Sequence, residues 1–250
     1  MKRVIAKLDI KSGFVIKGIE FEGVRKVGDP IDLAKKYFKE NIDEIIYLDC
    51  VASLYNRNHI IDLLPRVCEE VFIPITAGGG IRTFKDAKKL FDNGADKIVI
   101  NTGAVRNPKI VKEISNYYGS QAVVLQLDCK KINQNKWEVY TDYGRERTGL
   151  DAMDWVKKIS NFGIGEILAT VIDHDGKKNG VDLNFLKRLK EITNLPIIAS
   201  GGIGNASHIE QIFKFKEINA VSISSSLHYN DHTINELKLS LKKKGFNFRN

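Results

Sequence analysis

The chain has 250 residues, of which 43% are hydrophobic, and it carries a formal net charge of +8. This length and composition are typical of a single globular domain with a large core. Membrane helices need roughly 18 consecutive apolar residues, which no run in the chain provides, and the N-terminal segment meets an acidic residue too early for a secretory signal. We therefore expect a cytoplasmic protein without a membrane segment.

The positive charge does not predict nucleic-acid binding. The lysines are spread along helical stretches, and no basic stretch is interleaved with aromatic residues. The three cysteines, Cys50, Cys68 and Cys129, form no CxxC pair, and the five histidines show no metal-ligand spacing. We expect neither a nucleic-acid site nor a metal site.

Short apolar runs alternate with amphipathic helical patterns along the whole chain. Residues Asp32–Asn41 and Phe84–Gly94 are typical helical stretches, and the glycine at the end of the second is a stop signal. The apolar runs that we interpret as strands are Val4–Asp9, Glu44–Asp49, Ile73–Thr76, Lys97–Asn101, Ala122–Asp128, Glu166–Ile172, Pro196–Ser200 and Ala220–Ser224.

Strands that alternate with helices pair in parallel through helical crossovers. Eight such units, with strands apolar on both faces, predict one (β/α)8 TIM barrel, and a doubly wound open sheet is the structural alternative. Two segments depart from the simple unit: Lys11–Asp29 predicts a hairpin or mobile flap, and Lys131–Tyr143 predicts a second hairpin. Both follow strands whose C-terminal ends form the catalytic face of such a barrel.

The second half of the chain repeats the first. Asp9 and Asp128 end corresponding strands 119 residues apart, Glu44 and Glu166 are 122 apart, and the glycine runs ending at Gly80 and Gly202 are also 122 apart. A fixed offset of this kind indicates two fused units. We expect a two-fold barrel with half-barrels of about residues 1–120 and 121–250, which the open-sheet alternative would not explain.

The aspartates at the strand ends are the candidate catalytic groups. Strands one and five of an eight-stranded barrel face each other across the mouth, so Asp9 and Asp128 can act there as general acid and base. The alternative role for such a residue is to cap the following loop through backbone amides, which we expect of Asp49.

The two glycine runs predict two phosphate sites. Each run follows a strand and precedes a helix, where backbone amides and the helix N-terminus favour an anion. Tight turns are the alternative explanation for the glycines. The groups that we expect around the two sites are Gly80, Asn101 and Thr102 for the first and Asp175, Gly176, Gly201, Gly202, Ser225 and Ser226 for the second. Such a pattern favours a substrate with a phosphate at each end.

Four charged residues begin their strands at the opposite end of the barrel. Arg3, Glu44, Lys97 and Glu166 alternate in sign, and charges near a barrel axis are costly unless they are paired. We expect a closed ring of ion pairs there, acting either as a stabilising plug or as a gate.

These motifs together resemble the cyclase subunit of imidazole glycerol phosphate synthase, an enzyme of histidine biosynthesis. The resemblance extends from end to end and rests on LDIKSGFVIKG, GDPIDLAKKY, IDEIIYLD, AGGGI, GADKIVINT, IDHDGKKNG, ASGGIGN and the tail INELKLSLKKKG. It implies that ammonia adds to a linear phosphoribulosyl formimino aminoimidazole carboxamide nucleotide, that the imidazole ring closes, and that aminoimidazole carboxamide ribotide leaves. No metal or organic cofactor is implied.

The resemblance also implies a role for each matching residue. Asp9 and Asp128 match the acid/base pair, Lys17 the flap lysine, and Thr170 a substrate-binding position. The phosphate-site residues match those expected above, and the four-charge ring matches the gate of an ammonia channel. Asp96 matches an interface position on the N-terminal face, where a glutaminase subunit would dock to form a heterodimer.

The chain departs from the family pattern close to both aspartates. Lys7 and Gln126 stand two residues before Asp9 and Asp128, where the family has small residues, and both should point into the barrel. We expect Lys7 to hold Asp9 ionised, to weaken it as a proton donor and to narrow the path for ammonia. Further departures are Val99 and the segment from Cys50 to Asn58.

Three hypotheses follow from the resemblance and its departures. The favoured one is the cyclase working with a glutaminase. The second is a paralogue of the kind found with surface-polysaccharide genes, which passes ammonia to a sugar amidotransferase. The third is the sister phosphoribosyl aminoaldose–ketose isomerase, which uses the same two aspartates.

Overall fold

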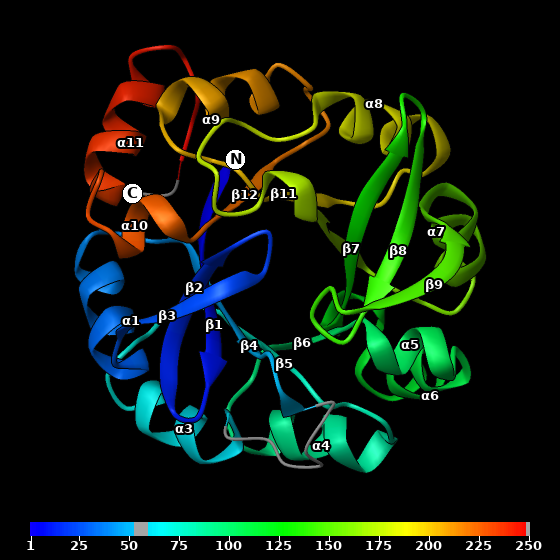
Figure 1. Cartoon of the computed structure of the whole chain (residues 1–250). Coiled ribbons are helices and arrows are strands. Elements are labelled where there is room, and N and C mark those ends of the chain that lie inside the picture. The colour runs from blue at the N-terminus through cyan, green and yellow to red at the C-terminus, as the bar shows by residue number, and fades with distance from the viewer. Residues whose placement is uncertain (53–59, 249–250) are drawn as a thin grey trace.

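Eight parallel strands close into a barrel in the computed structural model, which describes residues 1–52 and 60–248 (Figure 1). Strand β7 pairs with β10, and β12 pairs with β1, so the sheet of the described residues has no open gap between its ends. The predicted TIM barrel is confirmed and the open-sheet alternative is wrong. The barrel strands are β1 (Arg3–Lys11), β4 (Glu44–Asp49), β5 (Ile75–Gly78), β6 (Lys97–Ile100), β7 (Val123–Asn133), β10 (Glu166–Val171), β11 (Ile197–Ser200) and β12 (Ala220–Ile223).

Helices surround the barrel, as Figure 1 shows. Helix α4 begins where Thr83 and Asp86 form a capping box, in which each side chain binds the other residue's backbone amide. The α-helices are α1 (Pro30–Lys39), α3 (Ile60–Cys68), α4 (Phe84–Asp92), α5 (Thr102–Arg106), α6 (Lys109–Tyr118), α7 (Ala152–Ser160), α8 (Leu183–Ile192), α9 (Ala206–Phe213), α10 (Ser225–His228) and α11 (Ile234–Lys242). The 3-10 helices are η1 (Ser120–Ala122) and η2 (Ile172–His174). Among the described residues, no helix is long and apolar enough to cross a membrane.

Two predicted elements are displaced by two residues. Helix α1 begins at Pro30 rather than Asp32, because the Asp29 side chain caps its first turn and proline suits that turn. Strand β5 begins at Ile75 rather than Ile73, after Pro74, which has no amide hydrogen for the ladder. The predicted departure at residues 53–58 lies outside the described residues.

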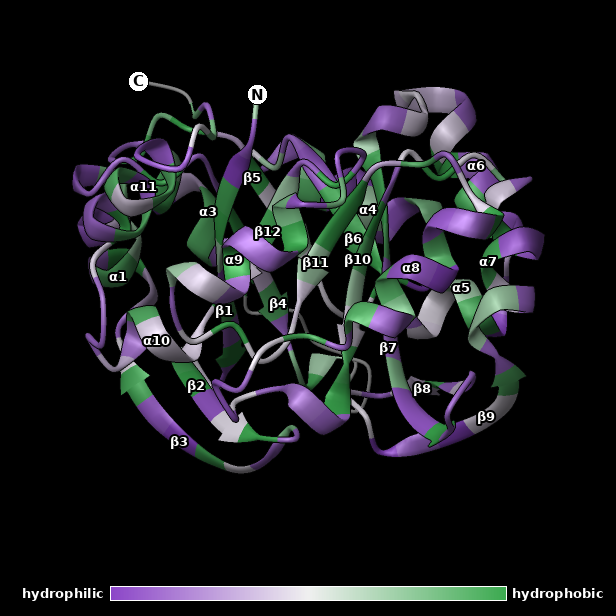
Figure 2. Cartoon of the chain, turned by 90° about the horizontal axis from the view of Figure 1, so that it is seen from above, coloured by the Kyte–Doolittle hydropathy of each residue, from purple (hydrophilic) through white to green (hydrophobic). Residues whose placement is uncertain are grey.

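Both predicted hairpins are present. Strand β2 (Phe14–Ile19) runs antiparallel to β1 and pairs with β3 (Glu22–Gly28), which makes the flap. Strand β8 (Lys136–Thr141) runs antiparallel to β7 and pairs with β9 (Glu146–Asp151), so this hairpin extends eight residues beyond the predicted end at Tyr143. Figure 2 shows both hairpins on one face of the barrel and the N-terminus on the other.

The barrel has two apolar cores. A large one lies between the strands and the helices. A smaller one fills the axis with Ile5, Ile46, Leu48, Val99, Val124, Leu168, Ile198 and Ala220, which come from all the barrel strands except β5. The predicted departure at Val99 therefore belongs to the axial packing. This apolar layer separates the charged N-terminal end of the barrel from the polar mouth.

A buried ion pair joins the first and last helical units. Lys238 of α11 lies 2.7 Å from the Asp43 carboxylate and donates to the carbonyl of Asn41, while Asp43 also accepts from the amide of Val4. Both side chains are buried. Because a buried charge is costly without its partner, this pair is a stabilising link only while both members are present.

We predict that Lys238→Met lowers the free energy of unfolding by about 3 kcal/mol, since it leaves the buried Asp43 carboxylate unpaired. Chemical denaturation measures this loss. Lys187→Met changes an exposed lysine of α8 and should change the same free energy by less than about 0.5 kcal/mol. Equal effects of the two substitutions would contradict the role of the pair.

Candidate active site

Asp9 and Asp128 lie on opposite sides of the barrel mouth. Three strands (β4, β5 and β6) separate β1 from β7 along one side of the closed sheet. Both carboxylates are fully buried. Each lies where its strand, β1 or β7, leaves the barrel and continues into a hairpin. Their environments are different, although the two halves of the barrel carry the same order of elements.

Cations and a phenol surround Asp9. Lys7 Nζ lies 3.6 Å from Oδ1, and Lys17 Nζ lies 3.8 Å from Oδ2. The hydroxyl of Tyr143 donates to Oδ2 at 3.2 Å. The negative charge of Asp9 is thus balanced by two ammonium groups that are themselves buried.

Amide groups surround Asp128. Gln126 and Asn101 donate to its Oδ2 at 2.6 and 3.2 Å. Burial raises the pKa of Asp128 to about 7, against the opposing effects of the Lys7 charge and the Gln126 hydrogen bond. A carboxyl group with this pKa can both donate and accept a proton near neutral pH.

Lys7 and Gln126 point into the barrel, as their strand positions predict. Lys7 is buried; burial alone would lower its pKa, but the charges of Asp9, Asp175 and Asp128 outweigh it and raise the pKa above its ordinary value. The Lys7 carbonyl accepts from Ser224 Oγ and lies 3.1 Å from His228 Nε2. Lys7 is therefore a protonated group held directly beneath Asp9.

The first glycine run borders a cavity of about 180 Å³. Gly79 and Gly80 have positive φ angles, and a Cβ at Gly80 would lie 2.8 Å from Ala52 Cβ, so the loop has no room for a larger residue. The residues that line this cavity include Gly79, Gly80, Arg82, Asn101, Thr102, Arg106, Gln126 and Asp128. The predicted first phosphate site and Asp128 therefore share one space.

The second glycine run borders a smaller cavity of about 10 Å³. Its lining includes the predicted Asp175, Gly176, Gly201, Gly202 and Ser225, and also Ser200, Ser222 and Ser224. The predicted Ser226 is not part of this lining, since its hydroxyl donates to the carbonyl of Ile203. Thr170 is buried beside Gly201, where a Cβ would lie 3.2 Å from the Thr170 methyl group.

The flap contacts the loop that borders the second cavity. Lys17 forms a buried ion pair with Asp175, and the amide of Glu20 donates to the Asp175 carbonyl at 2.9 Å. Lys17 and Lys7 act against the effect of burial and hold the pKa of Asp175 below its usual range. A Cβ at Gly176 would lie 2.4 Å from the Gly18 carbonyl, so glycine is required for this close approach.

Unsatisfied polar atoms gather at the mouth. Seven buried side-chain polar atoms of the described residues have no hydrogen-bond partner, and five of them belong to the site. They are Asp9 Oδ1, Asn101 Oδ1, Asp128 Oδ1, Thr170 Oγ1 and Ser222 Oγ. Since buried polar groups are normally paired, their concentration here indicates a site built for a polar ligand. No cluster of His, Cys, Asp or Glu in the described part of the chain could hold a metal ion.

Sequence reasoning missed several residues of the site. Ser200 and Ser222 follow the inward-facing Ile198 and Ala220 by two residues, so strand alternation could have found them. Tyr143 and Phe21 carried no such signal, because their positions depend on how two hairpin tips meet. Asp49 accepts from the amide of Val51 at 3.1 Å, which agrees with its expected capping role.

The four charges at the other end form a closed ring. Arg3 pairs with Glu44 at 2.8 Å and with Glu166, while Lys97 lies 3.1 Å from Glu44 and 3.2 Å from Glu166. Thr76 also donates to Glu44 at 2.7 Å. Next to the ring, the exposed Asp96 accepts from the amide of Ile75 at 2.8 Å.

We predict that Lys7→Met raises the pKa of Asp128 further above about 7, because it removes the main charge that opposes the effect of burial. A carboxyl ¹³C NMR titration, with Asp128 assigned through Asp128→Asn, measures the shift. Lys112→Met, at an exposed position of α6, is the control and should leave the pKa unchanged. A titration of Asp128 that does not move in Lys7→Met would show that the two groups do not interact.

Comparison with known proteins agrees with the geometry of the barrel and its site. The model of a family described as "Histidine biosynthesis protein" matches residues 3–233. The imidazole glycerol phosphate synthase subunit HisF of Pyrococcus furiosus is 46% identical over 248 residues, which cover 99% of this chain and 98% of the relative. The subunits of the same name from Methanococcus maripaludis and Bacillus cereus are 44% and 43% identical, and they cover 99% and 96% of this chain and 98% and 96% of the relatives. The chain therefore belongs to the histidine biosynthesis protein family and to the family of HisF subunits of imidazole glycerol phosphate synthase.

Proposed function

We propose that the chain is the cyclase subunit of imidazole glycerol phosphate synthase. It uses ammonia to convert the linear phosphoribulosyl formimino nucleotide into imidazole glycerol phosphate and aminoimidazole carboxamide ribotide. One observation carries the proposal: two buried carboxylates face each other between two glycine-lined cavities on equivalent parts of the barrel. A substrate with a phosphate at each end would place its reacting atoms between Asp9 and Asp128.

The two carboxylates suit different proton transfers. Addition of ammonia leaves a surplus proton on nitrogen, which a base must remove, and each leaving group needs a proton from an acid. Asp9 lies between two ammonium groups, which pair with its carboxylate. Asp128, with a pKa of about 7, is the better proton donor. We assign Asp9 as the base and Asp128 as the acid.

The phosphate sites rest on the lining of the two cavities. Gly80, Asn101 and Thr102 would bind one phosphate, with Arg82 and Arg106 nearby. Asp175, Gly176, Gly201, Gly202 and Ser225 would bind the other, mainly through backbone amides. Thr170 lies among the buried groups of the mouth, and Lys17 would close over the substrate from the flap.

The partner would dock at the N-terminal face. The relatives are named as subunits, which implies a partner subunit for this chain too. We infer a glutaminase that forms a heterodimer around Asp96 and delivers ammonia to the ring of Arg3, Glu44, Lys97 and Glu166. In this role the ring is a gate, because ammonia can pass along the axis only if the ion pairs separate.

A second candidate function rests on Lys7 and Gln126. Their long side chains occupy the region below the carboxylates, where they leave less room for ammonia to reach a substrate. A barrel of this kind could instead pass ammonia to a sugar amidotransferase of surface-polysaccharide synthesis without closing an imidazole ring.

We predict turnover of the phosphoribulosyl formimino nucleotide by the purified chain with excess ammonium salt at mildly alkaline pH, because free ammonia replaces the partner. Asp9→Asn and Asp128→Asn should each lower kcat at least about 100-fold, the usual scale of acid/base catalysis. Chromatographic detection of the two products measures the rate, and circular dichroism checks that the variants fold.

Each alternative predicts a different result in this assay. A folded parent chain that binds the nucleotide without turnover would contradict the cyclase and support the conduit. Conversion of the aminoaldose precursor without ammonia would support the isomerase. Full activity of Asp128→Asn would contradict the role assigned to that residue.

We predict that kcat falls as the pH rises above about 7, if free ammonia is kept constant by adjusting the total ammonium. The reason is that Asp128 loses its proton through this range and can no longer act as the acid. Steady-state rates across pH 6–9 test this assignment. A kcat that rises through pH 7 and then levels off would instead make Asp128 the base.

A further inference from the structure

The tips of the two hairpins meet above Asp9. Phe21, at the tip of the flap, stacks on Tyr143, at the tip of the β8–β9 hairpin, with ring centroids 4.4 Å apart and ring planes inclined by 14°. The Tyr143 hydroxyl points down and donates to Asp9 Oδ2 at 3.2 Å. The two hairpins, which follow corresponding strands of the two half-barrels, therefore converge on one carboxylate.

Both tips have a strained backbone. Glu20 and Phe21 have φ angles of 52° and 64°, and Asp142 and Tyr143 have φ angles of 51° and 58°. Residues other than glycine seldom adopt this left-handed region, and they keep it only where surrounding contacts demand it. We therefore expect contacts with other parts of the molecule to hold both tips in this conformation.

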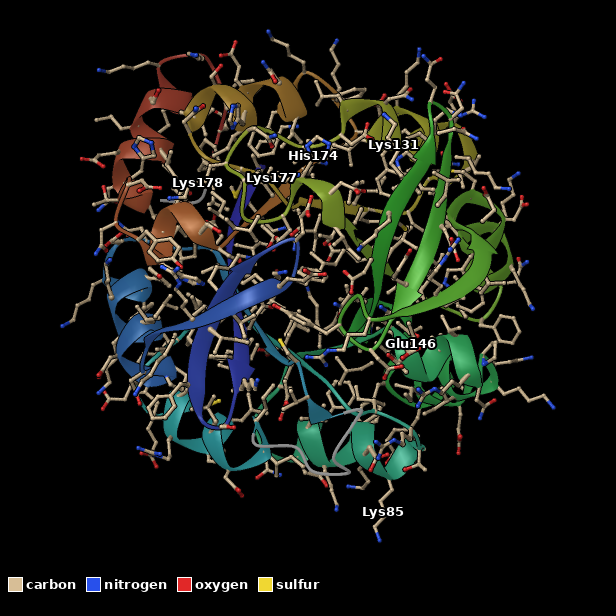
Figure 3. The ribbon with its side chains drawn as sticks, viewed as in Figure 1. Lys85, Lys131, Glu146, His174, Lys177 and Lys178 are labelled. Carbon is tan, nitrogen blue, oxygen red and sulfur yellow. The ribbon has the colours of Figure 1, made fainter. Side chains whose placement is uncertain are left out.

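Each hairpin tip contacts residues of a different predicted phosphate site. The amide of Asp142 donates to Thr102 Oγ1 at 3.0 Å, and Arg106 pairs with the Asp142 carboxylate at 2.8 Å. On the other side, Glu20 binds the Asp175 backbone and pairs at 2.5 Å with Lys177, on the loop after β10 (Figure 3). The stack between the tips thus spans the mouth from one predicted phosphate site to the other.

The close approach of the tips leaves little freedom at the stack. Gly144 has a φ angle of 76°, and a Cβ at this position would lie 2.9 Å from Phe21 Cδ2. The Lys7 ammonium lies 5.3 Å from the centre of the same Phe21 ring. Phe21 is therefore packed between Tyr143, Gly144 and Lys7, so an open flap would remove the support of the Tyr143 ring.

We propose that Tyr143 is a positioning residue for Asp9, and that it holds this carboxylate in its reactive orientation only while Phe21 of the closed flap is stacked on it. The hydrogen bond holds Oδ2, while Oδ1 lies 3.6 Å from the Lys7 ammonium and has no hydrogen-bond partner among the described residues. Without the hydroxyl, the carboxylate can rotate and exchange its two oxygens. The catalytic part of this proposal rests on the cyclase function.

Tyr143→Phe tests the proposal because it keeps the aromatic stack and removes only the hydroxyl. A hydrogen bond to a charged group corresponds to a loss of about ten- to a hundredfold in kcat, and KM for the nucleotide should stay within about twofold of the parent. Tyr117→Phe, at an exposed tyrosine of α6, is the matched control and should leave both constants unchanged. An unchanged kcat in Tyr143→Phe, or a change confined to KM, would overturn the proposal.

Phe21→Leu tests the part played by the flap. It removes the stack and keeps the Tyr143 hydroxyl, so kcat should fall, and adding Tyr143→Phe to this background should lower kcat by a smaller factor than in the parent. Equal factors in the two backgrounds would show that the hydroxyl acts without the flap, against the proposal.

A readout that needs no turnover separates this proposal from the proposed function. The carboxyl ¹³C resonance of Asp9, assigned through Asp9→Asn, should shift in Tyr143→Phe and in Phe21→Leu but not in Tyr117→Phe. An Asp9 resonance that stays in place in Tyr143→Phe would contradict the contact even if the cyclase assay succeeds. A shift in a protein without cyclase activity would uphold the contact and reject only the cyclase.

Discussion

The buried charge of Asp9 is the constraint on which the rest of the mouth depends. A carboxylate with no exposed surface is stable only if cations or hydrogen-bond donors replace water. Here Lys7 approaches it from below, Lys17 from the flap and Tyr143 from the second hairpin. The flap therefore completes the surroundings of Asp9, and its Lys17 also pairs with Asp175 beside the second glycine-lined cavity.

The two-fold barrel becomes asymmetric at this point. Asp9 and Asp128 occupy corresponding strands, but lysine precedes one and glutamine the other by two residues. The lysine places a positive charge beside Asp9, whereas the glutamine donates only a neutral hydrogen bond to Asp128. Burial is the largest effect on Asp128 and raises its pKa to about 7. The two corresponding strands thus place one carboxylate between two ammonium groups and the other between two amide groups. The departures at Lys7 and Gln126 are compatible with acid/base chemistry, although they also leave less space on the axis.

Much of this arrangement could be predicted from the sequence, because it depends on the alternation of side chains along each strand and on motifs that recur in both halves of the chain. Strand ends identified Asp9 and Asp128, the paired glycine runs identified both cavities, and strand starts identified the ring that contains Glu44. Alternation along the strands also oriented Lys7. These features need only a strand's direction and its place in the barrel.

The rest could not be predicted because it depends on contacts between loops. Nothing in the pattern around Phe21 or Tyr143 indicates that the two tips stack, since each tip is held in a strained conformation by distant residues. A related reason explains why only one of two predicted neighbouring serines lines the second cavity. Ser225 lines it, whereas the hydroxyl of Ser226 donates to the carbonyl of Ile203. The hydrogen-bond partner of a side chain at the start of a helix depends on residues from other loops, which the spacing of motifs along the sequence does not identify.

The most direct test of the central claim is a ³¹P NMR titration of the chain with the phosphoribulosyl formimino nucleotide in ammonia-free buffer, where the substrate binds without reacting. The claim that two equivalent anion sites hold the two ends of one substrate across Asp9 and Asp128 predicts one nucleotide per chain, with both phosphate resonances shifted together. Two nucleotides per chain, or a shift of only one of the two phosphates, would contradict it.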